Sequence, residues 1–403
     1  DASPMAGVSW QQTLTMKVLH VIPSLDSSDG GPTTALAHMA GSVAVEGIDV
    51  FVATTIDREE AAEKQLQFGV PIRVDSWTCY FFPRQSRFYK ISVSLLKWLW
   101  DHTREYDLVH IHAVFSFAPI AAWRAALRSK VPYIVCPHGL LNQWGMIHRR
   151  KRLKALSFRF IERPLLNGAS AIHYTSTAEQ DEAAPLNLTA RSVVVPLGID
   201  TSAFHHLPER NVFEEAHPVV KSRSLILFLS RIDPKKGIEM LLQAWKLVAE
   251  SHPNTLLVLA GSGAADYTAS LHALAKELGI DSKIVWTGLL GHEGRRAALG
   301  AADVFVLPSK SESFGLALLE AMASGVPCVS TTGVALGQEA AAAGAVRLAS
   351  YDARDIASAI IDLLNSPETR TGLGEAGKSF AASRYSLKSM GQALASLYKE
   401  TAK

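Results

Sequence analysis

The sequence predicts two doubly wound α/β domains, each built on a parallel sheet. Short apolar runs rich in β-branched residues alternate with helical stretches, and a polar linker at 205–221 interrupts this alternation before it starts again. At 403 residues the chain also exceeds the size of one ordinary hydrophobic core. An eight-stranded α/β barrel would alternate in the same way. The central break, and polar residues suited to ligand binding at the starts of both halves, favour two domains that face a cleft.

The first half begins with a predicted strand at 18–22, a loop of Ser, Asp and Gly at 24–31 and a helix at 32–46. Further apolar runs that predict buried strands follow at 50–53, 108–112, 133–136, 171–174 and 193–196. Residues 1–15 are polar and aperiodic, so we expect a disordered lead-in, or a remnant added for expression, outside the fold.

In the second half, the same pattern predicts strands at 225–229, 255–260, 284–286, 304–307 and 327–330. The last helix is expected at about 387–403, with apolar positions at Met390, Leu394, Leu397 and Tyr398. This pattern alone allows the helix to pack on either domain.

Composition excludes several classes of protein. The 40 Lys and Arg against 38 Asp and Glu give a net charge of +2, too small for a general nucleic-acid binder. The three cysteines lie far apart without metal-ligand spacing, so we expect neither a disulfide framework nor a zinc site, and we expect a reducing cytoplasmic setting. No apolar run reaches the roughly 18 residues that a membrane-spanning helix needs, so a soluble chain is expected.

Residues 309–322 carry the strongest functional signal, because they follow a predicted strand and open a helix. The backbone amides of residues 314–316 would be unsatisfied donors of the first turn, where the helix dipole favours an anion. Glu312 lies just before this helix and Glu320 about two turns into it, so one ligand across the helix start could contact both. Ionised carboxylates accept hydrogen bonds from sugar hydroxyls. The alternative is that Glu312 only pairs with the helix dipole and Glu320 is a solvated or core-edge residue.

The loop at 230–237 follows the first predicted strand of the second half and carries Arg231, Lys235 and Lys236. Ligands of open α/β sheets bind at this end of the strands, and an Arg fork beside a mobile Lys suits a pyrophosphate. A surface charge cluster is the alternative, but the nearby segment 309–322 favours a phosphate site. The chain has no DxD-type acidic pair that would hold a metal and a pyrophosphate, so we expect a metal-independent site.

Two loops of the first half are further candidates. Gly30 and Gly31 follow the first strand and lead into a helix, so their amides could approach a phosphate or sugar, or simply form a tight turn. His138, in Pro-His-Gly after a predicted strand, could donate to a sugar hydroxyl or stabilise developing charge. His110 and His112 lie on one predicted strand, and we expect them to face opposite sides and to make a poor metal pair.

A basic cluster at 149–154 contains five cations in six residues and precedes Phe158 and Phe160. Such a cluster suits anionic lipid headgroups or a lipid-diphosphate acceptor. It is equally compatible with a solvated face, and both interpretations stay open.

Together these residues resemble the retaining glycosyltransferases of glycosyltransferase family 4, which have the GT-B fold. Glu312 and Glu320 match the E-x7-E signature of that family, and Arg231 and Lys236 match its Arg and Lys before glycine. His138, Gly30 and Gly31 match positions of its acceptor domain, and residues 196–200 look like the segment that leads to its inter-domain crossing. The likeness runs from Met16 onward and is most specific in the second half. Residues 332–339 depart from it, because they lack the double glycine before Glu339, whose role stays open.

The resemblance implies a nucleotide-sugar donor, held mainly by the second domain, and no cofactor. The implied contacts are Arg231 and Lys236 to the diphosphate, Glu320 to the ribose, Glu312 to the donor sugar, Phe314, Gly315 and Leu316 to the sugar and phosphate through their amides, and Leu290 near the base. From the first domain, Gly31 would approach the phosphate and His138 would touch the transferred sugar.

The resemblance also implies domain boundaries. We expect an N-terminal acceptor-binding domain at 16–203, a C-terminal donor-binding domain at 204–385, and a C-terminal helix at 386–403 that returns to the N-terminal domain.

We therefore expect a retaining, metal-independent hexosyltransferase for exopolysaccharide, lipopolysaccharide or glycolipid synthesis, located in the cytoplasm or on the inner face of the plasma membrane. The expected donor is UDP-glucose, with GDP-mannose next, and the expected acceptor is a saccharide or a lipid-linked saccharide. A GT-B epimerase and a non-catalytic nucleotide-sugar binding protein are the alternatives. The intact set of Arg231, Lys236, Glu312 and Glu320 argues against the second alternative.

Overall fold

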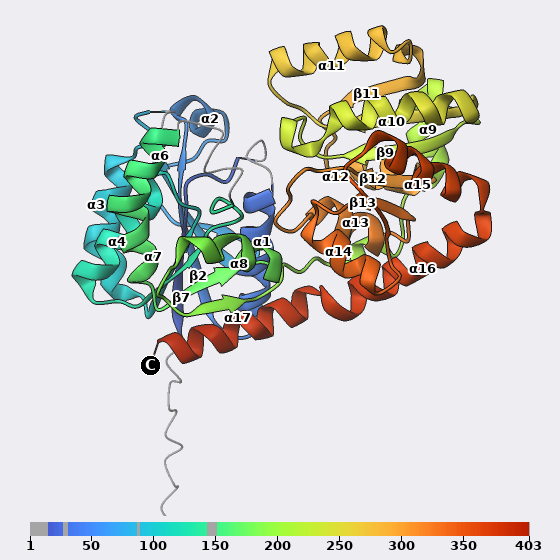
Figure 1. Ribbon diagram of the computed structural model, residues 1–403. Coiled ribbons are helices and arrows are strands. Elements are labelled where there is room, and N and C mark those ends of the chain that lie inside the picture. Colours follow the sequence, from blue (N-terminus) through green and yellow to red (C-terminus); the bar gives the residue numbers. More distant parts are fainter. Residues whose placement is uncertain (1–14, 27–30, 87–88, 143–150, 403) are drawn as a thin grey trace, which may run out of the picture.

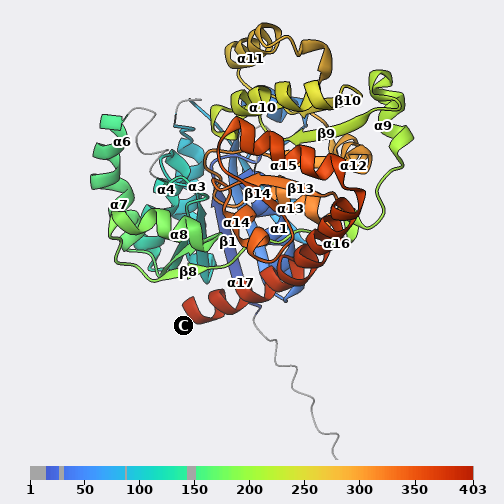
Figure 2. The same ribbon diagram turned by 45° about the vertical axis from the view of Figure 1, so that its right-hand side comes forward.

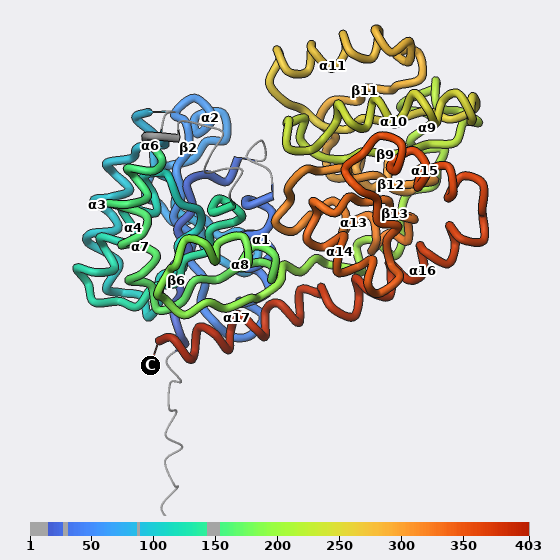
Figure 3. Tube along the Cα trace, viewed as in Figure 1, coloured from blue at the N-terminus to red at the C-terminus, as the bar shows by residue number. Residues whose placement is uncertain are grey.

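The computed structural model describes residues 15–26, 31–86, 89–142 and 151–402, and its chain forms two sheets of mainly parallel strands flanked by helices (Figure 1). The two-domain doubly wound fold predicted from the alternation of strands and helices is confirmed. The backbone trace in Figure 3 follows the chain from one sheet to the other and back along the C-terminal helix.

The first sheet has eight strands, in the spatial order β3(Ile72–Val74), β4(Trp77–Pro83), β2(Asp49–Ile56), β1(Lys17–Ile22), β5(Leu108–His112), β6(Tyr133–Cys136), β7(Ala171–Tyr174) and β8(Ser192–Val194). All neighbouring strands are parallel except the antiparallel hairpin β3–β4 at one edge. This hairpin was not predicted, since its aromatic and polar residues do not form an uninterrupted apolar run.

The second sheet has six strands, all parallel, in the order β11(Ile284–Gly288), β10(Thr255–Ala260), β9(Ser224–Leu229), β12(Val304–Leu307), β13(Cys328–Thr331) and β14(Arg347–Ala349). Edge strand β14 was also not predicted, because it is only three residues long. Both sheets place the carboxyl ends of their strands toward the loops that carry the candidate site residues.

Alternate residues of β1 enter two separate cores, as the pleat of a strand buried on both faces requires. Val18 and Ile22 pack in the core that contains Leu36 of α1(Gly31–Val45). Leu19 and Val21 pack in the other core, with α3(Val93–His102) and α4(Phe117–Ser129). His20 has the same parity as Val18 and therefore lies on the α1 face.

The remaining α-helices connect and cover the strands. They are α2(Arg58–Glu63), α6(Lys151–Ser157), α7(Arg163–Asn167), α8(Thr177–Ala183), α9(Arg210–Ala216), α10(Ile238–Ser251), α11(Ala265–Glu277), α12(His292–Ala301), α13(Leu316–Ala323), α14(Ala335–Ala342), α15(Ala353–Asn365) and α16(Pro367–Arg384). A membrane-crossing helix would need more length and apolar character than any helix in the described part of the chain has.

The C-terminal helix α17(Leu387–Thr401) runs back from the second sheet and packs against α1 of the first (Figures 1 and 2). Its return depends on two close backbone approaches. A Cβ at Gly391 would lie 2.6 Å from the Ser42 carbonyl oxygen, and one at Gly198 would lie 2.5 Å from that of Ser386. Glycine at both positions therefore lets the helix cross and dock tightly, which confirms the predicted return of this helix.

Candidate active site between the two domains

The loop after β9 and the segment before α13 meet at the carboxyl edge of the second sheet. Gly237 allows this approach, because its φ is +69° and a Cβ there would overlap the Pro308 carbonyl oxygen. The Lys310 amide donates to the Lys235 carbonyl at 2.8 Å. As a result Lys236 Nζ forms an ion pair with Glu312 Oε2, and these two side chains are only 12% and 22% exposed.

The second predicted carboxylate, Glu320, lies on α13 with an 8% exposed side chain. Its Oε2 forms an ion pair with Arg295 of α12, a residue that the sequence did not single out. Arg295 is one of two consecutive arginines in an ordinary amphipathic helix, so no local signal distinguished it. The structure thus gives each carboxylate of the E-x7-E pattern a cationic partner.

Helix α1 of the first domain also approaches this region. His38 shares a hydrogen bond with the Gly198 carbonyl at 3.0 Å, so its Nδ1 donates. Burial lowers the pKa of His38, while the carbonyl and the charge of Glu320 oppose that shift. His38 was missed because a single histidine on a helix carries no pattern.

The other residues predicted to bind the donor are less tightly held. Arg231 is exposed at the start of the β9 loop, and Leu290 is half-buried just before α12. Gly31 opens α1 with open space around its Cβ position, whereas Gly30 lies outside the described residues.

Helix α13 begins at Leu316 with Gly315 as its N-cap, so of the three predicted amides that of Phe314 lies before the first turn. Gly315 has φ +107° and precedes Leu316, the first residue of α13, whose amide therefore has no acceptor within the helix. Phe314 is buried, with its ring centroid 5.5 Å from that of Tyr385.

A loop of the first domain contacts this helix start. His138 and Gly139 both have positive φ, +52° and +73°, and a Cβ on Gly139 would overlap Ser313 Oγ. Ser176 Oγ also donates to the Ser313 carbonyl at 2.6 Å. The two domains therefore touch here, and the loops that carry His138 and Glu312 are neighbours.

Glu179 of α8 fixes the conformation of the His138 loop. Its carboxylate accepts hydrogen bonds from the Gly139 amide and from the Thr175 amide and hydroxyl, the last two at 2.7 Å. Burial raises the pKa of Glu179 while these three donors oppose the shift. Sequence reasoning missed Glu179 because its partners lie in different loops.

Two cavities lie between the domains. One has a volume of about 260 Å³ and is lined by Ala178, Glu179, Glu182, Lys310, Glu312, Ser313, Thr332, Gly333, Ala335 and Gln338. The other has a volume of about 210 Å³ and is lined by Thr175, Ser176, Thr177, Val194, Pro196, Phe314, Leu336, Glu339 and Tyr385. Both cavities combine residues of the two domains, and of the predicted site residues Glu312 lines the first and Phe314 the second.

The structure answers the question that the sequence left open for Glu339. Its Oε2 accepts a hydrogen bond from Tyr385 Oη at 2.6 Å, and its Oε1 pairs with Arg384 at 3.1 Å. Both partners lie at the end of α16, just before the chain returns to the first domain. Glu339 therefore anchors the crossing between the domains.

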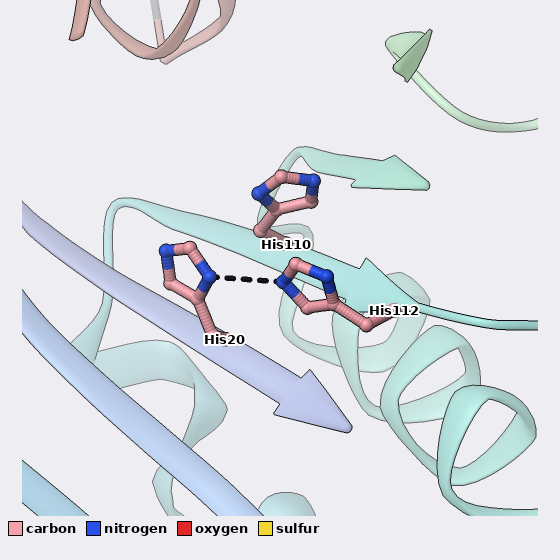
Figure 4. Close-up of side chains that lie close together, drawn as sticks. All are labelled: His20, His110 and His112. Atoms are coloured by element: carbon pink, nitrogen blue, oxygen red, sulfur yellow. Dashed lines mark hydrogen bonds between the residues drawn. The ribbon is translucent and has the colours of Figure 1, made fainter. Parts of the chain in front are cut away.

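The expectation for His110 and His112 was wrong. Residues two apart on a strand share a face, and the two ring centroids are only 4.3 Å apart. With His20 they form a compact buried group (Figure 4), in which the His20 and His112 rings share a 2.9 Å hydrogen bond. Ring nitrogens of these three residues lie within 4.8 Å of one another, close enough to hold a metal ion.

The basic cluster lies mostly outside what the structure describes: residues 149 and 150, and the side chains of 151–153, are not among the described groups. In the described part that follows, Leu156 and Phe160 are 59% and 63% exposed. Arg159 lies over the Phe160 ring, 5.6 Å from its centroid.

Comparisons with known proteins match both domains. Residues 30–198 match the family described as glycosyl transferase 4-like domain, and residues 209–380 match glycosyl transferases group 1. The chain is 27% identical to the GDP-mannose:cellobiosyl-diphosphopolyprenol alpha-mannosyltransferase of Komagataeibacter xylinus, over 96% of this chain and 93% of that protein. It is 25% identical to the alpha-monoglucosyldiacylglycerol synthase of Streptococcus pneumoniae, over 74% of this chain and 67% of that enzyme. The match to several other curated relatives spans only about half of their length.

Among solved structures, the fold is similar to that of Anabaena HepE in complex with UDP and glucose. The TM-score is 0.76 at 18% identity, and the match covers 96% of this chain and 100% of the other. At this identity the likeness shows the shared fold alone.

Proposed function

Because the chain belongs to the glycosyltransferases of the GT-B type, we propose that it transfers a hexose from a nucleotide-diphosphate sugar to a saccharide or lipid-linked saccharide acceptor. The observation that carries the proposal is the pair of carboxylates at the start of α13, each matched by a cation, at the interface of the two domains.

The proposed roles follow from charge and position. Lys236 and Arg231 neutralise the diphosphate, helped by the amides at the start of α13. Glu320 accepts hydrogen bonds from the ribose hydroxyls, and Glu312 accepts them from the hydroxyls of the sugar. Lys236 pairs with Glu312 and Arg295 pairs with Glu320, so donor binding exchanges these two ion pairs for charge-assisted hydrogen bonds to the donor.

We propose that the configuration at the transferred carbon is retained, with attack on the face that the diphosphate leaves. Glu312 and Glu320 both belong to the second domain and both are paired with cations, which supports binding roles for them. A glycosidase pair would instead flank the scissile bond. The departing phosphate is then the base that receives the acceptor proton, and His138 contacts the sugar from the first domain.

The donor follows less directly from the site. We propose UDP-glucose as the first candidate donor and GDP-mannose as the next, and the names of the relatives include both a glucosyl and a GDP-mannose enzyme. Both relatives are named for lipid or lipid-linked products, which supports an acceptor of that class. The exposed Leu156 and Phe160, beside the basic cluster, support membrane contact by this face of the first domain.

A ligand-binding panel tests the proposal. Thermal unfolding is followed with UDP, GDP, ADP, UDP-glucose, GDP-mannose and NAD, for wild type, Glu320→Ala and the exposed control Glu293→Ala. A ligand at about 100 times its Kd stabilises the fold by about 2.7 kcal/mol. We expect one nucleotide class to raise Tm in wild type and control, and to do so less in Glu320→Ala. Stabilisation by NAD alone, or an equal rise in Tm for wild type and Glu320→Ala, would contradict the proposal.

A further inference from the structure

Five histidines and one tyrosine form a continuous chain of ring contacts inside the first domain. They are His20 of β1, His110 and His112 of β5, His138 after β6, His173 of β7 and Tyr398 of α17. His20, His110 and His112 point toward one another from the two neighbouring strands (Figure 4). All members except His138 are fully buried, and they lie on the α1 and α17 face of the sheet.

The links of this chain are all within hydrogen-bond distance. In order from the far end they are Val195 O to His173 Nε2 at 2.9 Å, His173 Nδ1 to His110 Nε2 at 3.4 Å, His110 Nδ1 to Tyr398 Oη at 2.7 Å, Tyr398 Oη to His20 Nε2 at 3.4 Å, His20 Nδ1 to His112 Nε2 at 2.9 Å, and His112 Nδ1 to His138 Nε2 at 2.9 Å. Every imidazole in this series except that of His138 makes hydrogen bonds with both of its nitrogens.

The five imidazole rings are neutral, because burial lowers the pKa of each of these histidines. The pKa is about 3 for His20 and His138 and about 4 for His173. A neutral imidazole carries one N–H and one lone pair, so the direction of one hydrogen bond fixes the direction of the next.

The Val195 carbonyl sets that direction, since a carbonyl oxygen can only accept. His173 must therefore donate from Nε2, which leaves its Nδ1 as the acceptor for His110 Nε2–H. By the same rule Tyr398 donates to His110 Nδ1 and accepts from His20.

The same rule continues to the surface of the domain. His112 Nε2–H donates to His20 Nδ1, and His138 Nε2–H donates to His112 Nδ1. His138 Nδ1 is then left as a lone pair, and no hydrogen bond joins it to the described residues. His138 is also partly exposed and adjoins Gly139, which touches Ser313 of the other domain.

We propose that this buried chain holds His138 in the Nε2–H tautomer, so that its Nδ1 accepts a hydrogen bond from a hydroxyl of the transferred sugar. Tyr398 is the positioning residue at the centre of the chain, supplied by the C-terminal helix. The inference rests on the proposed function for the identity of the ligand, but not for the tautomer.

A metal ion held by His20, His110 and His112 is the competing explanation. The hydrogen bonds do not favour a metal ion, because every ring nitrogen of these three residues already has a hydrogen-bond partner.

Nitrogen-15 NMR of histidine-labelled full-length protein tests the tautomer without any ligand. The His138 signals are assigned by their loss in His138→Asn. We expect a protonated Nε2 and an unprotonated Nδ1 for His138, unchanged by added Zn²⁺. An Nδ1–H form, or loss of the cluster's signals on stoichiometric Zn²⁺ binding, would overturn the proposal.

Tyr398→Phe tests the positioning role, with Tyr133→Phe as a matched control. Tyr133 also has a buried hydroxyl, which donates to the Leu165 carbonyl at 2.8 Å but lies outside the chain. Tyr398→Phe removes the link between His110 and His20, so His138 should populate both tautomers. Tyr133→Phe should leave the His138 tautomer as it is in wild type.

Kinetics with UDP-glucose and GDP-mannose give the second measurement. We expect kcat/KM for the active donor to fall about threefold to tenfold in Tyr398→Phe, the range for loss of one neutral hydrogen bond, and less than about twofold in the control. Equal losses in both variants would overturn the positioning role. If neither donor is turned over or bound, the proposed function fails, while the tautomer result stands or falls on the spectra alone.

Discussion

Replacing Gly139 with alanine tests whether the contact between the two domains belongs to the working enzyme. The new methyl group would overlap Ser313 Oγ and would lie 2.7 Å from Ser313 Cβ, closer than carbon atoms pack. Alanine would also have to adopt the φ of +73° that Gly139 has. The substitution should therefore lower the folding stability of the first domain, and it should separately make closure of the two domains less favourable.

The two costs can be separated. An alanine in the left-handed region loses about 1–2 kcal/mol of folding stability. Gly344→Ala measures the loss of folding stability from the left-handed backbone by itself, because Gly344 has a φ of +72° and nothing within 4 Å of its Cβ position. The overlap with Ser313 can be relieved by opening the cleft, so it should leave the free energy of unfolding nearly unchanged. It should appear in activity, where about 1–3 kcal/mol of overpacking corresponds to a fall of about fivefold to 150-fold in kcat/KM.

The assay compares urea unfolding and donor turnover for Gly139→Ala, Gly344→Ala and Gly139→Ala with Ser313→Gly. We expect equal stability losses in the two single variants and an activity loss in Gly139→Ala alone. The added Ser313→Gly change should restore most of the activity, since it removes the atoms that clash and keeps the carbonyl that Ser176 contacts. An inactive double variant, or a fully active Gly139→Ala, would refute the reasoning.

Three further outcomes are expected. Glu320→Gln should weaken binding of the nucleoside diphosphate by about tenfold to 100-fold in calorimetry, because hydrogen bonds to an ionised carboxylate are lost, whereas exposed Glu293→Gln should not. Phe160→Ser should reduce sedimentation with anionic vesicles about tenfold, while Val219→Ser on the second domain, with a similar exposure of 61%, should bind as wild type does. The pKa of His20 is about 3 in the folded protein and about 6.5 in the unfolded chain. Because the unfolded state therefore binds a proton at His20 first, the free energy of unfolding falls as the pH drops below about 6.5. His20→Asn should flatten that fall by about 1.4 kcal/mol per pH unit between about pH 6 and 4 in urea titrations, and parallel curves would contradict it.

The strands that lie inside the sheets were predictable because a parallel strand buried on both faces is a continuous apolar run. The hairpin β3–β4 and the strand β14 have no such run, because β3 and β14 are only three residues long and β4 mixes aromatic and polar residues. The candidate donor site was predictable for a related reason. Lys236 and Glu312 each follow a strand, and right-handed crossovers bring the carboxyl ends of parallel strands to one edge.

The partners of these residues were not predictable. Arg295 of α12 meets Glu320 of α13, and Glu179 of α8 accepts a hydrogen bond from the Gly139 amide. Neither contact leaves a trace in local spacing, because helix packing angles and loop paths depend on the whole core.

The sequence by itself determined where the chain is buried and which residue types stand at the ends of its strands, since burial follows the local periods of helix and strand. Only the tertiary structure decided which side chains meet. Tyr398 contacts His110 from 288 positions along the chain, and it does so because α17 crosses back to the first domain and docks on α1. Gly139 and Ser313 touch for a similar reason, because the contact exists only once two separately folded domains are held against each other. Contacts of this kind depend on how finished elements pack, which no window of sequence contains.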